Sequence, residues 1–151
     1  MADIEEDAMD RPVRSIIGSQ VPVTATGELT VAQAARLMKE RRIGALLVLD
    51  DGRLAGIFTE RDALFRVVAE GGDPAQTRLA EVMTTNPRTI TPDRPFGHAL
   101  HLMHEGGFRH VPVVDHDRPV GVVSARDALG PELEAFVAEL DAREHIGEVM
   151  R

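Results

Sequence analysis

The 151-residue chain contains no cysteine, no tryptophan and no tyrosine. Without cysteine it cannot form disulfides, offer a thiolate nucleophile or bind zinc through sulfur. No apolar run approaches the roughly 18 residues of a membrane-spanning helix, and the opening residues are acidic, unlike those of a signal peptide. We therefore expect a soluble, cytoplasmic protein with no membrane partner.

Basic residues are also outnumbered, 17 lysines and arginines against 25 acidic residues, and the formal net charge is -8. An acidic chain repels polyphosphate backbones, so we expect no nucleic-acid partner. A small anionic ligand would need a locally basic pocket. The sequence also lacks a glycine-rich Walker loop, a nucleophilic serine elbow and a pair of catalytic acids, and we expect that the protein is not an enzyme.

What the chain does contain is an internal repeat. Residues 56–62 read Gly-Ile-Phe-Thr-Glu-Arg-Asp, and residues 121–127 read Gly-Val-Val-Ser-Ala-Arg-Asp, 65 positions later. One supersecondary unit has therefore been duplicated, and because units of this size are marginal alone, we expect the two copies to pack together. Identical residues continue at the same offset, among them the pairs Thr24/Thr89, Ala34/Ala99, Met38/Met103, Val48/Val113 and Asp50/Asp115.

Each copy has the pattern of a short strand, a helix, a strand pair and a second helix. This predicts an α/β fold of the α+β type, in which each copy forms a small three-stranded sheet with two helices. The predicted strands are 21–24, 45–49 and 54–58 in the first copy and 88–91, 110–114 and 120–123 in the second. The predicted helices are 30–42 and 59–70, then 95–105 and a last helix beginning at Ser124 that Gly130-Pro131 interrupts.

The same patterns divide the chain into five parts. We expect a flexible acidic leader at 1–12, repeats at 13–70 and 82–130, a linker at 71–81 and an amphipathic helix at 131–151. The last helix carries apolar residues at helical spacing, so it must pack against the same chain or against a second subunit. The sequence leaves both possibilities open.

Both strand pairs end in the same polar corner. Thr59 is followed three residues later by Asp62, as Ser124 is by Asp127, and this spacing is that of an N-terminal capping box. The corner can therefore be purely structural. A helix N-terminus also binds phosphate, a carboxylate there can accept two ribose hydroxyls, and an arginine lies beside each corner. These arginines are Arg61 and Arg126.

In these corners and their flanking blocks, the chain resembles a tandem pair of CBS domains, the modules named after cystathionine β-synthase. The shared pattern is glycine, an apolar residue, any residue, a hydroxyl, two residues and an acid, supported by the blocks 42–48 and 108–115. The resemblance covers roughly residues 13–130. It implies that the two repeats face each other with pseudo-twofold symmetry and bind adenosine derivatives in the clefts between them.

The resemblance also implies roles for individual residues. Asp62 and Asp127 would accept the ribose hydroxyls, and Thr59 and Ser124 would contact the phosphate or nearby ribose. In the first copy Gly44 and Ala45 replace the second copy's basic pair, so we expect the Asp127 cleft to bind phosphate better. The residues bordering adenine would be Ile43, Gly44, Ala45, Val111 and Pro112, and those reaching phosphate across the cleft Arg109 and His110.

The resemblance predicts a non-catalytic regulatory module, a homodimer with a downstream protein target. Its ligand would be an adenine nucleotide, AMP, ADP or ATP, with NAD or S-adenosylmethionine as alternatives, and no cofactor is required. The alternative is a structural dimerisation module with degenerate pockets.

Three histidines stand at three-residue steps in the helix predicted at 95–105. His98, His101 and His104 could bind a metal in pairs on one helical face. The apolar stripe of this helix leaves them mostly facing outward, toward solvent or another subunit, so we expect no metal site.

Overall fold

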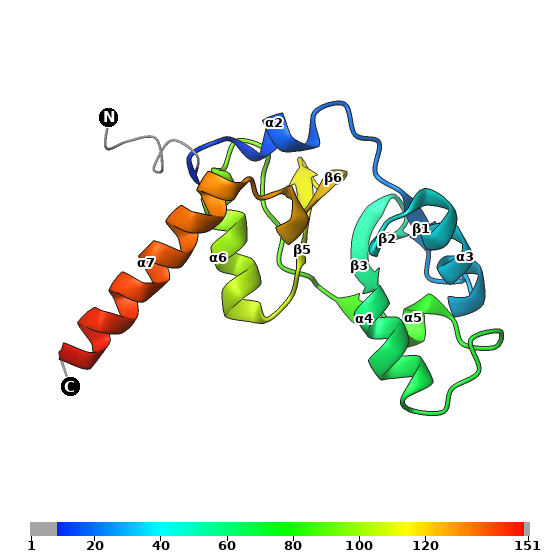
Figure 1. Cartoon of the computed structure of the whole chain (residues 1–151). Helices are drawn as coiled ribbons and strands as arrows, with labels where there is room; N and C mark the ends of the chain where they lie inside the picture. The colour runs from blue at the N-terminus through cyan, green and yellow to red at the C-terminus, as the bar shows by residue number, and fades with distance from the viewer. Residues whose placement is uncertain (1–8, 150–151) are drawn as a thin grey trace.

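The computed structural model describes residues 9–149 and forms two α/β halves that lie side by side (Figure 1). Residues 1–8 of the predicted leader lie outside the described residues, whereas Met9 packs against the core of the second half. No helix within residues 9–149 is long and apolar enough to cross a membrane.

The first half is built on a sheet with the strand order β1-β2-β3-β4. β2 is buried from Ala45 to Val48, because its continuous apolar run lies between neighbours on both edges and packing on both faces. β1 pairs with it in parallel, and the other neighbours are antiparallel. The strands are β1 (Thr24–Thr26), β2 (Ala45–Asp50), β3 (Arg53–Thr59) and β4 (Thr84–Thr85).

α3 (Val31–Arg41) covers this sheet. It begins at Thr30, whose side chain accepts a hydrogen bond from the backbone N–H of Gln33, and ends at Arg42 in the left-handed conformation with φ 55°. After β3 come α4 (Glu60–Asp62) and η1 (Ala63–Val68), so half of the helix predicted at 59–70 is a π-helix.

α5 (Leu79–Val82) follows within the predicted linker and first residue of the second repeat. The side chain of Leu79 is fully buried in the core of the first half.

The second half contains α6 (Phe96–Gly106), β5 (His110–Asp115) and β6 (Arg118–Ser124). α6 ends at Gly106, one residue later than predicted, and Gly107 follows with φ 70°. A single 3-10 turn, η2 (Ala125–Asp127), replaces the helix expected directly after Ser124. α7 (Gly130–Val149) then runs along α6 and away from the body of the molecule (Figure 1).

The mixed α/β fold of two repeats is confirmed, but the count of three strands in each sheet is wrong. The first sheet has four strands and the second has two. In the predicted strand 88–91 only Ile90 pairs, in an isolated parallel bridge with Val113. Pro87 and Pro92 flank this segment, and because proline has no N–H to donate, pairing stops there.

α2 (Val13–Ile17) lies at the start of the predicted first repeat, 13–70, but packs in the second half. Val13 and Ile17 join the core around Phe96, and the chain then crosses to β1 (Figure 1). The boundaries of the repeats stay predictions. The core of the second half contains residues from the start of the chain as well as from the second repeat.

At the glycine of each repeated corner, a residue from another segment of the chain packs directly against the backbone. A Cβ on Gly121 would lie 2.8 Å from Cγ2 of Ile17, and a Cβ on Gly56 would lie 2.7 Å from Sδ of Met83. Real Cβ atoms do not approach so closely, so both glycines are explained by packing.

Candidate functional site: two clefts between the repeats

The first repeated corner is a capping box in the folded chain. Oδ2 of Asp62 accepts hydrogen bonds from the backbone N–H of Thr59 at 3.0 Å and from its hydroxyl at 3.1 Å. The Thr59 hydroxyl in turn accepts from the backbone N–H of Asp62 at 3.2 Å. The structural role of the motif is therefore present.

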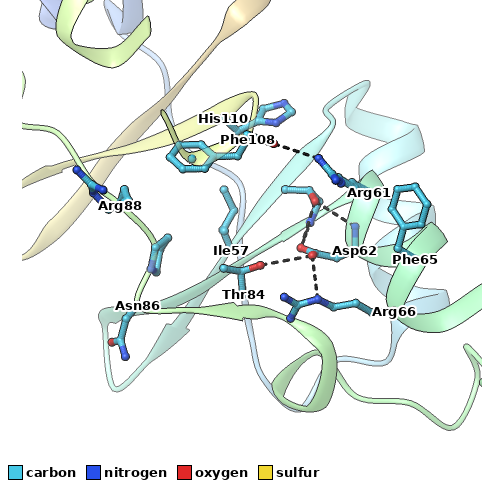
Figure 2. Close-up of a pocket in the computed structure, with 14 residues that line it drawn as sticks. Ile57, Arg61, Asp62, Phe65, Arg66, Thr84, Asn86, Arg88, Phe108 and His110 are labelled. Carbon is cyan, nitrogen blue, oxygen red and sulfur yellow. Dashed lines mark hydrogen bonds and ion pairs between the residues drawn. The ribbon is translucent and has the colours of Figure 1, made fainter. Parts of the chain in front are cut away.

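The second carboxylate oxygen of Asp62 is also occupied. Oδ1 lies 3.4 Å from the hydroxyl of Thr84 and 3.5 Å from Nε of Arg66 (Figure 2). Asp62 is buried, with 8% of its surface exposed. A ligand could use this carboxylate only by displacing one of these partners.

The second corner leaves its carboxylate freer. Oδ2 of Asp127 accepts from the backbone N–H of Ser124 at 2.7 Å, and the Ser124 hydroxyl lies 3.4 Å away. Within the described residues no hydrogen bond or ion pair engages Oδ1 of Asp127, which belongs to a half-buried side chain. One oxygen is thus fixed in place while the other can accept.

A first cleft of about 470 Å³ opens beside Asp62, between the two halves. Figure 2 shows Arg61 pointing toward the segment that carries Phe108 and leads into β5 at His110. Arg61 donates to the carbonyl of Gly107 at 3.0 Å, and Arg66 donates to the carbonyl of Met83 at 3.0 Å. Two of the arginines that line this cleft are therefore already engaged by the protein.

A second cleft of about 440 Å³ lies beside Asp127. Its walls combine residues of the first repeat, the connection at 20–23 and the second corner. The side chain of Gln20 fixes that connection, because its Oε1 accepts from the backbone N–H of Val122 at 2.8 Å. The second cleft is lined by Gln20, Val21, Pro22, Val23, Arg42, Ile43, Gly44, Ala45, His110, Val122, Ser124, Arg126 and Asp127.

Most of the predicted site residues are brought together in these clefts. Thr59, Arg61 and Asp62 line the first, and His110 lines both. The second contains the predicted residues Ile43, Gly44, Ala45, Ser124, Arg126 and Asp127.

Arg109, Val111 and Pro112 line neither cleft. Val111 is fully buried in the core of the second half, and the backbone carbonyl of Arg109 accepts from Ala125 N–H at 3.0 Å. Successive strand residues point to opposite faces, so β5 directs His110 and Val111 differently. The ligand roles of these three residues stay predictions.

Sequence reasoning missed several basic residues of the clefts. Arg42 lies in the second, and Arg66 and Arg88 lie in the first. Arg42 opens the block 42–48 that supports the family resemblance; its place at the end of the predicted helix allowed a contact with phosphate but favoured a solvated position. Arg66 and Arg88 carry no repeat signal, since the aligned positions of the other copy are different residues.

His110 lies where the two clefts meet. Burial lowers the pKa of its imidazole below the usual 6.5, and Glu60 opposes that shift while Arg109 adds to it. A Cβ on Gly44 would lie 3.2 Å from Nε2 of His110 and 2.9 Å from Oε1 of Glu60. These two side chains therefore lie close over the backbone of residue 44, and a side chain at this position would push them away.

The three histidines of α6 do not share one environment. His98 and His104 are exposed, but His101 lies under α7, with Nε2 3.1 Å from Oε1 of Glu139. Its ring also meets Phe136 edge-on at 5.0 Å. In residues 9–149 no three histidine, aspartate or glutamate side chains gather closely enough to bind a metal ion.

The sequence profile described as "CBS domain" matches residues 6–69 and 79–131. CBS domain-containing protein YhcV of Bacillus subtilis is 36% identical over 115 residues, which cover 76% of this chain and 81% of that protein. Other curated relatives are longer, and the chain spans about a fifth of the length of two that it matches in Arabidopsis thaliana.

Solved structures share the fold. The CBS domain pair of protein MJ0100, in complex with methylthioadenosine and S-adenosylmethionine, matches with a TM-score of 0.69 and 30% identity over 77% of this chain and 94% of that one. The hexameric CBS-CP12 protein from bloom-forming cyanobacteria matches with a TM-score of 0.72 and 30% identity over 80% of this chain and 70% of that one. The chain therefore belongs to the CBS-domain family and carries two CBS domains in tandem.

Proposed function

We propose that this protein is a regulatory module that binds an adenine nucleotide or a related adenosyl compound between its two repeats, chiefly in the second cleft. The observation that carries the proposal is the geometry of Asp127. Ser124 holds one of its carboxylate oxygens, and the other is left to accept ribose hydroxyls inside a cleft of about 440 Å³. The complex of MJ0100 with adenosyl ligands supports the chemical class.

In the second cleft, different residues would bind the ribose, the phosphate and the base of such a ligand. Asp127 would accept from the ribose, while Arg126 supplies positive charge for phosphate. Ile43, Gly44 and Ala45 offer apolar and backbone surface to the base. In this arrangement the ligand is bound and released unchanged.

Signalling follows from the position of the second cleft, whose walls come from both repeats. A ligand that touches both halves binds most tightly to one relative arrangement of them. It therefore shifts the population toward that arrangement by the difference in binding free energy, and a downstream protein partner can recognise the result.

The first cleft is proposed as a weaker site. Both carboxylate oxygens of Asp62 already contact protein groups, which belong to Thr59, Thr84 and Arg66. A ligand that binds to this carboxylate must therefore break one of these contacts. Of the three arginines around it, only Arg88 has no described hydrogen bond or ion pair.

We also propose that a second copy of this chain covers the exposed apolar face of η1, which consists of Leu64, Phe65 and Val68. Between 53% and 65% of each of these residues is exposed. A contiguous apolar face of this kind typically marks an interface, and the hexameric CBS-CP12 protein is a related chain that assembles. The cytoplasm stays the predicted location.

The test is the thermal unfolding of the chain with AMP, ATP, NAD and S-adenosylmethionine. A ligand at about 100 times its Kd stabilises the fold by about 2.7 kcal/mol, which raises Tm by about 5–10 °C in a chain of this size. Asp127→Asn keeps an oxygen that accepts from the Ser124 N–H, but it removes the negative charge of the carboxylate that would accept from the ribose hydroxyls. We expect it to weaken binding by about tenfold or more.

Asp62→Asn is the matched control, because it makes the same change in the other corner. Its effect on ligand affinity should be smaller than that of Asp127→Asn. Equal affinities for the wild type and Asp127→Asn would refute the site assignment. A Tm that none of the four ligands moves would favour the alternative, a structural dimerisation module. Turnover of nucleotide, abolished by Asp127→Asn, would instead identify an enzyme.

A further inference from the structure

The second cleft does not end at Gly44. A neighbouring hollow of about 400 Å³ lies over the carboxyl end of α3, and we call it the basic hollow. The cleft and the basic hollow share Arg42, Ile43, Gly44 and Arg126 in their walls, so they are neighbours. Glu60 and His110 lie close over the backbone of Gly44, so the side of the shared wall left for a ligand is the one lined by Arg42 and Arg126.

The basic hollow adds cations that no protein group neutralises. Lys39, Arg42 and Arg126 line it, and within residues 9–149 no hydrogen bond or ion pair engages their charged groups. Lys39 lies in the last turn of α3, Arg42 follows the helix as its C-cap, and both line the hollow. In the first cleft, by contrast, Arg61 and Arg66 are held by backbone carbonyls.

Two features act against an anion here. Glu60 also lines the hollow, and the carboxyl end of a helix carries a partial negative charge of about half a unit. Three cations outweigh these two contributions. Their side chains are exposed, so they can move onto a bound ligand without first leaving a protein partner.

We propose that the basic hollow binds the outer phosphates of a nucleoside triphosphate whose ribose is held at Asp127. This inference rests on the proposed function of the second cleft. The first phosphate meets Ser124 and Arg126, and the chain of phosphates then extends along Arg126 toward Arg42 and Lys39. Lys39 and Arg42 are thus specificity residues that favour a triphosphate over a monophosphate. The negative charge of Glu60 in the same hollow weakens that preference.

The test is calorimetric titration of the full chain with AMP and with ATP in magnesium-free buffer. Lys39→Gln should weaken ATP binding by about threefold to tenfold and change AMP binding by less than about twofold, because only the longer ligand meets this charge. Arg42→Gln should weaken ATP binding more than AMP binding, since Arg42 lines both the second cleft and the basic hollow. Glutamine keeps a long polar side chain at position 42. Both residues carry a Cβ, so the substitution leaves the backbone with the same positive φ. Glu60→Gln should strengthen ATP binding and leave AMP binding unchanged.

Arg41→Gln is the matched control, since it removes the same charge from the adjacent, exposed position outside both hollows. If Arg41→Gln weakens ATP binding as much as Arg42→Gln, the effect is that of net charge and the inference is wrong. Equal losses for AMP and ATP, or no loss for either, would also overturn it while leaving the proposed function intact. If wild-type protein binds neither nucleotide, the proposed function itself fails.

Discussion

The buried ion pair between Arg11 and Glu132 makes a quantitative prediction about stability. Glu132 is fully buried, and its Oε1 accepts from Nη2 of Arg11 at 2.5 Å and from the backbone N–H of Leu129 at 3.1 Å. Arg11 also donates to the backbone carbonyl of Asp127 at 3.1 Å. This one side chain therefore links the leader, the second corner and the start of α7.

Replacing Arg11 with methionine would leave the Glu132 carboxylate with a single backbone donor. Breaking a buried ion pair by removing one partner costs about 3–5 kcal/mol. The side chain of Arg11 is 30% exposed, so water can partly replace it, and the donor from Leu129 remains. We therefore expect a loss of about 2–3 kcal/mol, which lowers Tm by about 4–12 °C in a chain of this size.

Chemical and thermal unfolding followed by circular dichroism would measure this loss. Arg14→Met is the control, because it removes the same type of side chain from an exposed position on α2. The double variant Arg11→Met/Glu132→Leu should recover much of the loss, since Oε2 of Glu132 has no hydrogen-bond partner to forfeit. An Arg11→Met loss within about 0.5 kcal/mol of the control would refute the reasoning.

Two further predictions concern His110 and the exposed face of η1. Burial lowers the pKa of His110, so the ring is neutral at pH 7, and a bound phosphate favours its protonated form. Nucleotide affinity should therefore rise as pH falls from about 8 to 6, and His110→Gln should flatten that profile; an unchanged profile would exclude the role. Without ligand, the unfolded chain takes up a proton near pH 6.5 that the folded chain does not, so His110 lowers stability as pH falls through that value. Val68→Glu should weaken self-association by about tenfold or more in sedimentation equilibrium, and an unaltered association constant would remove η1 from the interface.

Local patterns in the sequence were enough to predict much of this fold. The repeat is visible from identical residues alone, and the apolar run of β2 and the helix predicted at 30–42 each depend on residues within one strand or one helix. The corner at Asp62 was equally local, and its capping box is present in the folded chain. Such patterns survive folding because they arise from backbone hydrogen bonding and side-chain periodicity.

Long-range packing decided the rest. No pattern near Val13 indicates that α2 joins the second core, and none near Arg42 or Lys39 indicates a basic hollow beside the second cleft. The two corners look alike in sequence, yet Arg66 and Thr84 occupy Asp62 while Asp127 keeps a free oxygen. The sequence by itself determined two polar corners, and the tertiary structure decided which of them can bind. The physical reason is that a local cap needs only its own turn, whereas the accessibility of its carboxylate depends on which distant segments pack against it.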